Sequence, residues 1–167
     1  ILAPPTLHVI RGVRDWAGSD AGNNRNWEKL TAILLDAPSA NGKPVESIEI
    51  RSGVVGFPVK TPTLPPATHT NCYLVGEQEL VVIDPASPYE EEQLRLDEHL
   101  DWLQRNRGVR VREILLTHHH PDHVAGVAHA QKKWGVPVAA HPETARLLAG
   151  KITVDRHVLD GDVIELP

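Results

Sequence analysis

One short stretch, Thr117–His123 with the sequence THHHPDH, constrains this chain more than any other part. The apolar run Ile114–Leu116 precedes it, and a segment with helical features follows it. The stretch therefore brings several metal-binding side chains together where a strand is expected to lead into a helix, and it predicts a metal site at that junction.

The spacing within the stretch suggests which side chains bind which metal ion. His118 and His120 are two positions apart, so on an extended strand end they point the same way and can hold one ion at about 2.0–2.1 Å. Asp122 and His123 are adjacent, and at the start of the helix they can face a second ion. Pro121 favours an extended His120, which keeps the first two ligands on the strand side.

The alternative is a surface histidine run or the remnant of an expression tag. A tag would not lie between a buried-type strand and a helix with Asp and His in this register. His119 is left out of the predicted site, because alternation turns it away from its neighbours. His69, which follows a run of prolines, remains an open candidate. The other histidines are predicted to be structural or solvent-facing, namely His8, His99, His129, His141 and His157.

Strand and helix signals alternate from about residue 70 to 150, which predicts an α/β fold with helices covering a sheet. Strands are expected over 47–51, 71–75, 80–83, 111–116 and 136–140, with two more around Asp160-Gly161. Helices are expected over 88–106, with Ser87 as N-cap and a solvated acidic face, and over 122–134 and 142–149. Four prolines between residues 58 and 66 predict an extended loop that ends at residues 68–70.

Residues 1–43 differ in composition from the motif region. They predict a helix over 6–16, a polar linker over 18–26 and a strand over 31–36. Residues 4–7 and the short helix resemble the C-terminal tail of Nudix-type domains, although the Nudix box of glutamates is absent. We expect 1–43 to be the tail or linker of a preceding domain, Nudix-like in character.

The pattern His-x-His-x-Asp-His at residues 118–123 resembles the signature of the metallo-β-lactamase-fold hydrolases. Residues 71–75 and 80–84 resemble the first hairpin of that family, and its last residue, Asp84, would orient the histidine ligands from behind. Residues 159–164 resemble the turn and strand before the family's next ligand. Among groups of the family, the glyoxalase-II-like and the lactamase-like endoribonuclease groups look most similar.

The resemblance covers about residues 46–167 and implies an αββα sandwich. Residues 44–167 would be its N-terminal half, because the family's remaining ligands lie in a second half. The implied activity is hydrolysis with one or two zinc ions, or iron or manganese, which would generate hydroxide near neutral pH. Asp122 would be the catalytic residue that orients the hydroxide and relays its proton.

Ester, thioester, lactam and phosphodiester cleavage all stay open, so the expected partner is a small-molecule substrate or RNA. Two alternatives also stay open: a metal-binding or interaction module without turnover, and an iron-bound redox protein of the same fold. A polypeptide that ends at Pro167 is expected to hold zinc weakly and to lack hydrolase activity, because it would lack its C-terminal half.

Composition narrows the setting of the protein. The net charge of −5 gives no basic footprint for duplex nucleic acid. No apolar run approaches the roughly 20 residues that span a bilayer, and the first residues lack a signal peptide's basic start. Cys72 is the single cysteine, which excludes an internal disulfide and fits a reducing compartment. We expect a cytoplasmic protein without a membrane partner, and the absence of Met predicts a fragment.

Overall fold

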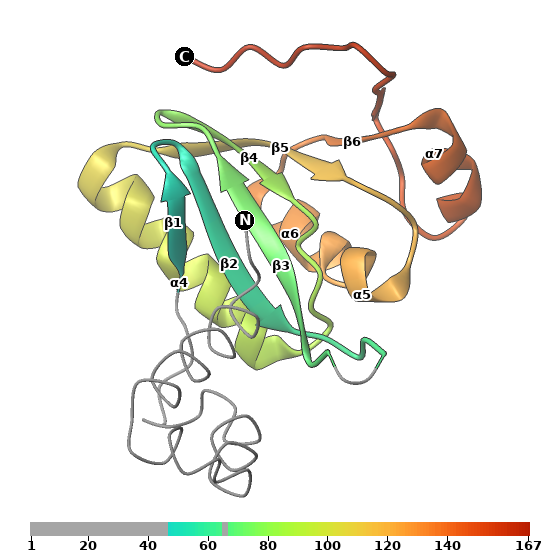
Figure 1. Cartoon of the computed structure of the whole chain (residues 1–167), viewed down its shortest axis with the longest axis horizontal. Helices are drawn as coiled ribbons and strands as arrows, with labels where there is room; N and C mark the ends of the chain where they lie inside the picture. The colour runs from blue at the N-terminus through green and yellow to red at the C-terminus, as the bar shows by residue number, and fades with distance from the viewer. Residues whose placement is uncertain (1–46, 65–66) are drawn as a thin grey trace, which may run out of the picture. The chain divides into compact units, whose positions relative to one another are not determined.

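A computed structural model describes residues 47–64 and 67–167 (Figure 1). The helix, linker and strand expected before residue 44, and the Nudix-like tail, lie outside the described residues. In chain order the elements are β1 Ile48–Arg51, β2 Val54–Lys60, β3 His69–Val75, β4 Glu79–Ile83, α4 Glu90–Arg107, β5 Arg110–Leu116, α5 Pro121–Val124, α6 Val127–Trp134, β6 Val138–Ala140, α7 Pro142–Leu148 and β7 Arg156–His157.

The described strands form one mixed sheet in chain order from β1 to β7. Neighbours from β1 to β4 are antiparallel and are joined by turns or loops, whereas neighbours from β4 to β7 are parallel. Parallel neighbours need crossover connections, and helices supply them: α4 before β5, α5 and α6 before β6, and α7 before β7. The predicted α/β class is confirmed.

The helices bury one face of the sheet. Leu74, Val82 and Ile114 are aligned across β3, β4 and β5 and are almost fully buried. In Figure 1, α4 and α6 lie behind the sheet. Two core clusters result, one with Leu96 and Leu100 of α4 and one with Val127 and Ala130 of α6. Burial of such side chains contributes about 1.5–3 kcal/mol each.

The opposite face carries the alternate residues, among them Tyr73, Ile83 and Leu115, which are aligned across β3, β4 and β5 and are only partly buried. Among the described residues, neither core cluster includes the three side chains of this row. One helical layer on one sheet is half of an αββα sandwich, and the layered prediction agrees with it. None of the described helices is long and apolar enough to cross a membrane.

Strand β2 corrects the expected proline loop, because Pro58 lies inside it opposite Asn71. Among residues 47–64 and 67–167, the pairing of β1 with β2 reaches only Gly56, so no described strand pairs with β2 at Pro58 on that side. The Pro58 carbonyl accepts a hydrogen bond from Arg95 rather than from β3. The nitrogen and oxygen of one residue share a strand edge, so the missing N–H of Pro58 faces away from β3 and removes no hydrogen bond between β2 and β3.

The start of α4 also differs from the prediction. The helix begins at Glu90 after Tyr89, and no side chain caps it. Ser87, the expected N-cap, instead donates from Oγ to the Lys60 carbonyl at 2.7 Å and accepts from the Tyr89 N–H at 3.2 Å. The residue thus ties the segment after β4 to the end of β2. The predicted stop of the helix at Gly108, with φ of 70°, is confirmed.

The helix expected over 122–134 is divided into α5 and α6 at Gly126. A Cβ at Gly126 would lie 2.0 Å from the Pro85 carbonyl oxygen, so only glycine allows this close approach. Of the two strands expected around Asp160-Gly161, the structure describes the one before the turn, as β7, and no strand after it. Asp160-Gly161 is a turn in which the Asp162 carboxylate accepts the Leu159 N–H.

Candidate metal site

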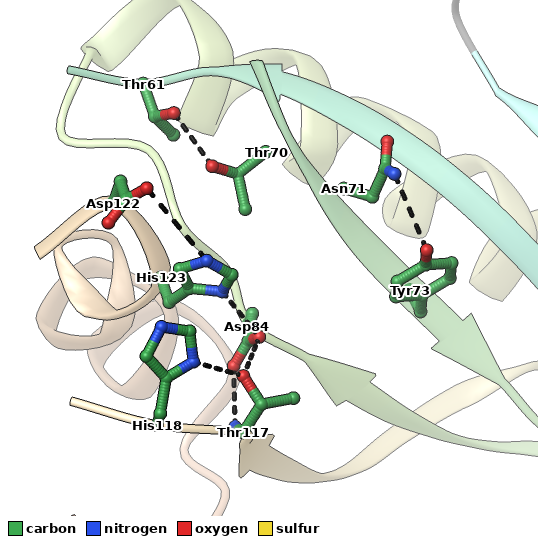
Figure 2. Close-up of polar contacts among 9 residues, drawn as sticks. All are labelled: Thr61, Thr70, Asn71, Tyr73, Asp84, Thr117, His118, Asp122 and His123. Carbon is green, nitrogen blue, oxygen red and sulfur yellow. Dashed lines mark hydrogen bonds and ion pairs between the residues drawn. The ribbon is translucent and has the colours of Figure 1, made fainter. Parts of the chain in front are cut away.

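The candidate site lies where two parallel strands end. Asp84 follows β4, Thr117 and the histidine loop follow β5, and α5 carries Asp122 and His123. Figure 2 shows these side chains converging from the three segments. The carboxyl ends of parallel strands are where α/β sheets place ligands, because the connecting loops diverge there.

Asp84 is the buried anchor of the site, with 3% of its surface exposed. Its Oδ1 accepts the Thr117 N–H at 2.9 Å, and its Oδ2 accepts from Thr117 Oγ1 at 2.5 Å and from His123 Nδ1 at 2.8 Å. Its φ of 51° is the one positive value among the described non-glycine residues. Asp tolerates this region better than most residues, and such strain tends to gather at functional sites.

His123 is oriented by that carboxylate. Its Nδ1 is occupied by Asp84, so its Nε2 faces the other side, where Asp122 Oδ2 lies 4.0 Å away. A carboxylate on one ring nitrogen fixes the tautomer and leaves the other nitrogen as a metal ligand. His123 therefore presents Nε2 as a ligand atom.

His118 lies against His123, with ring centroids 4.0 Å apart. Its Nδ1 contacts Thr117 Oγ1 at 2.9 Å, which leaves Nε2 for a ligand. Burial, His123 and His120 lower the pKa of His118, and the opposing charges of Asp84 and Asp122 do not reverse this. A lowered pKa favours the neutral imidazole, which is the form that binds metals.

Asp122 is the acidic group of the loop. Burial alone would raise the pKa of its carboxyl group, but hydrogen bonds from Thr63 and from its own backbone, with His123 and His120 nearby, lower the pKa overall. The carboxylate is therefore charged at neutral pH. A charged carboxylate beside imidazole side chains is a donor set that suits a borderline divalent ion.

The structure groups the predicted residues differently from the spacing argument. The potential ligand atoms of Asp84, His118 and His123 lie within 4.8 Å of one another. His118 is also near His120, with ring centroids 4.7 Å apart. Both oxygens of Asp84 already accept protein donors, from Thr117 and from His123.

The histidine loop is not a strand end, since β5 stops at Leu116. His120 is extended, with φ of −66° and ψ of 143°, so the predicted effect of Pro121 is confirmed. The ring of His119 lies 4.9 Å from that of His120 by centroid. The compact group of ligand atoms found among the described residues includes neither His119 nor the predicted ligands His120 and Asp122.

Three of the remaining described histidines have partners outside the site. His69 is exposed and bonds Thr68 Oγ1 at 2.8 Å. The Nδ1 of His141 accepts the Glu143 N–H and caps α7. His129 bonds Asp97 at 2.8 Å, and Asp97 is buried, so the acidic face of α4 is not wholly solvated as expected.

Two threonines of the site were missed in the sequence. Thr117 touches both Asp84 and His118, and its place between the strand and the first histidine was a usable signal. Thr63 bonds Asp122 from the loop after β2, and nothing local distinguished it from the neighbouring threonines.

A mixed sheet backed by helices, with histidines and aspartates at the ends of parallel strands, defines an α/β protein with a candidate metal centre. The family follows from comparison with known proteins. The chain belongs to the metallo-beta-lactamase superfamily, whose family model matches residues 65–164.

Solved structures support the fold. A metallo-beta-lactamase HARLDQ-motif mutant from Cronobacter sakazakii is 25% identical with a TM-score of 0.56, and the match covers 74% of this chain and 51% of that one. A metallo-beta-lactamase from Pontibacter korlensis is 25% identical with a TM-score of 0.57 and coverage of 72% and 55%. The chain thus spans about half the length of these structures.

Curated relatives match a shorter segment. A hydroxyacylglutathione hydrolase from Rhodopseudomonas palustris is 40% identical over 60 residues, which are 35% of this chain and 22% of the relative. A second, from Pseudomonas fluorescens, is 36% identical over 74 residues, with coverage of 41% and 25%. The matched segments amount to about a quarter or less of each relative's length.

Proposed function

We propose that the protein is a zinc-dependent hydrolase in which His118, His120, Asp122 and His123 hold the metal. The observation that carries this proposal is the orientation of the two bonded imidazoles. Asp84 and Thr117 occupy Nδ1 of His123 and of His118, which leaves Nε2 of each ring for a ligand, and the two ring centroids lie 4.0 Å apart. Oriented imidazoles beside a charged carboxylate are what a metal centre requires.

The donor set fits zinc. Imidazole nitrogen and carboxylate oxygen are ordinary zinc ligands, whereas a magnesium or calcium site would be built mostly from oxygen. Iron and manganese accept the same donors, and metal analysis of the purified protein distinguishes them. When bound, zinc would polarise the scissile group and lower the pKa of water.

The protein's own groups would prepare the water for attack. Asp122 is charged and lies beside His123, so its carboxylate would accept a hydrogen bond from the water and then its proton. Asp84 and Thr117 hold the histidines in place during this step. His118 and Asp122 are only partly buried, which leaves the site open to a substrate.

For the substrate we propose a small ester-type molecule, with an acylated thiol as the first choice. The relatives named as hydroxyacylglutathione hydrolases match a segment of this chain at 36–40% identity. Their name describes an acyl group on a small thiol and gives no support to the RNA alternative. The net charge of −5 also gives a phosphodiester chain no basic surface.

The same proposal includes the domain plan. We propose that residues 44–167 form the first half of the sandwich, that a second half supplies further ligands, and that 1–43 belong to a preceding domain. The partly buried row on the sheet face opposite the helices supports a second layer there.

Metal binding and turnover test the function separately. We expect His123→Ala to abolish the zinc-dependent shifts of histidine NMR signals in the full chain, because it removes the best oriented ligand. His129→Ala is the matched control, since His129 makes an equally short contact with an aspartate outside the site. Zinc binding that survives His123→Ala unchanged would contradict the site.

Turnover of hydroxyacylglutathione by the metal-loaded protein then tests the chemistry. Activity that His123→Ala and Asp122→Asn both remove would support hydrolysis at this site. Zinc binding without turnover would favour the metal-binding module, and iron with a reversible redox signal would favour the redox alternative.

A further inference from the structure

The hydrogen bonds around Thr117 determine where the protons of the site reside. The carboxylate of Asp84 can only accept, and it receives the Thr117 hydroxyl at 2.5 Å. A hydroxyl has one proton, so that proton is committed to Asp84. The 2.9 Å contact between Thr117 Oγ1 and His118 Nδ1 must then take its proton from the histidine.

We propose that Thr117 is a positioning residue whose hydroxyl transmits the charge of Asp84 to His118, which fixes the His118 proton on Nδ1 and leaves Nε2 bare. The same carboxylate fixes His123 directly, at 2.8 Å. One buried acid thereby sets the tautomer of both histidines. The tautomers are inferred from the hydrogen bonds alone. Only the expectation that the bare Nε2 atoms bind a metal rests on the proposed function.

The opposite proton arrangement conflicts with these contacts. If the Thr117 hydroxyl donated to His118, its oxygen would face Asp84 Oδ2 at 2.5 Å with a lone pair on each atom. That arrangement would require a protonated Asp84, although the same oxygen also takes a donor from His123. Two acceptors at that distance repel, so the chain from His118 through Thr117 to Asp84 is the consistent one.

The residue type at position 117 follows from this role. The backbone N–H of Thr117 binds Asp84 Oδ1 while its side chain binds Oδ2, so one residue clamps both carboxylate oxygens. The hydroxyl then has a lone pair left for His118. Serine offers the same atoms, whereas valine matches the shape without the oxygen.

The test measures the imidazole tautomers directly in the metal-free protein. In the full chain labelled with ¹⁵N-histidine, long-range ¹H–¹⁵N spectra near neutral pH separate protonated from bare ring nitrogens. We expect His118 and His123 to carry their proton on Nδ1 in the wild type. In Thr117→Val, His118 should lose this fixed preference, while His123 keeps it as an internal control. Thr117→Ser should restore the wild-type spectrum.

A zinc titration of the same samples gives the second readout. Loss of a group that orients a ligand typically weakens metal binding about 10–100-fold, so we expect that loss in Thr117→Val and near wild-type affinity in Thr117→Ser. A His118 proton found on Nε2 in the wild type, or an unchanged His118 tautomer in Thr117→Val, would overturn the inference without any variant having to bind metal. Correct tautomers with no zinc binding in the wild type would instead overturn the proposed function alone.

Discussion

Two aspartate–histidine pairs in this protein have almost the same geometry and different surroundings. Asp84 bonds His123, and Asp97 bonds His129, each at 2.8 Å. Both aspartates are buried, with 4% and 8% of their side chains exposed, and both histidines are partly open, at 25% and 34%. The pair alone therefore does not distinguish a candidate site from a structural contact.

The difference lies in what else each aspartate meets. Asp84 accepts three donors, two of them from Thr117. Asp97 Oδ1 is buried with no hydrogen-bond partner in the described structure, and the same holds for the indole nitrogen of Trp134. Both of these side chains line a small cavity between α4 and α6. The first pair is part of a satisfied network, and the second joins two helices.

The strand ends explain this contrast. Asp84 and Thr117 stand at the carboxyl ends of two hydrogen-bonded parallel strands, so the backbone brings their side chains together. Asp97 lies on α4 and His129 lies on α6, so their contact joins two neighbouring helices. An aspartate–histidine pair becomes a candidate metal site when the other ring nitrogen of the histidine faces additional metal-binding side chains.

The largest expected difference between the two pairs is in stability. Asp84→Asn keeps an acceptor but places N–H donors against the donors of His123 and Thr117, and asparagine tolerates the positive φ. Hydrogen bonds to a charged group contribute about 1.5–3 kcal/mol each, so losing two should lower the free energy of unfolding by about 4 kcal/mol. Asp97→Asn loses one such bond, so we expect about 1.5 kcal/mol. Urea denaturation measures both, and equal losses would contradict the contrast.

The next largest effect is expected at Gly126, which touches both regions. It lines the cavity beside Asp97, and its Cα faces the Pro85 carbonyl that follows Asp84. A methyl group there would lie 2.0 Å from that oxygen, so Gly126→Ala should destabilise the protein by about 3 kcal/mol. Gly135→Ala is the control, because it has open space and only its positive φ costs about 1 kcal/mol. If thermal unfolding shows that Gly135→Ala is the more destabilised variant, then the contact between Gly126 and Pro85 adjusts easily to a methyl group.

Local sequence signals predicted most of the strands and helices that surround the candidate site. The strands that lead to Asp84 and Thr117 and the helix stops at Gly108 and Gly135 were visible, because apolar runs and glycine report on their own neighbourhood. The histidine motif also identified the region of the candidate site. These features depend on residues close in sequence.

The features that the sequence did not reveal depend on distant contacts. The break at Gly126 follows from the approach of Pro85, and the bond of Thr117 to Asp84 joins residues 33 positions apart. Asp97 was assigned to a solvated face because its partner, His129, lies 32 positions away. Strand β2 was missed because the side of the strand that tolerates Pro58, the side facing away from β3, is defined only once the sheet has formed.

The smallest expected effect concerns the histidines beside the first pair. If further ligands make a site of the Asp84–His123 pair, then His120 should contribute to zinc binding, because its ring lies 4.7 Å from that of His118 by centroid. We expect His120→Ala to weaken zinc binding about tenfold, or about 1.4 kcal/mol. His119→Ala should change it by less than about twofold, because among the described ring contacts His119 reaches His120 but not His118. A zinc titration followed by histidine NMR compares the two variants at the same exposed loop. Equal weakening in both variants would show that the loop provides no specific third imidazole ligand. The contrast between the Asp84–His123 and Asp97–His129 pairs would then rest on Asp84, Thr117 and His118 alone.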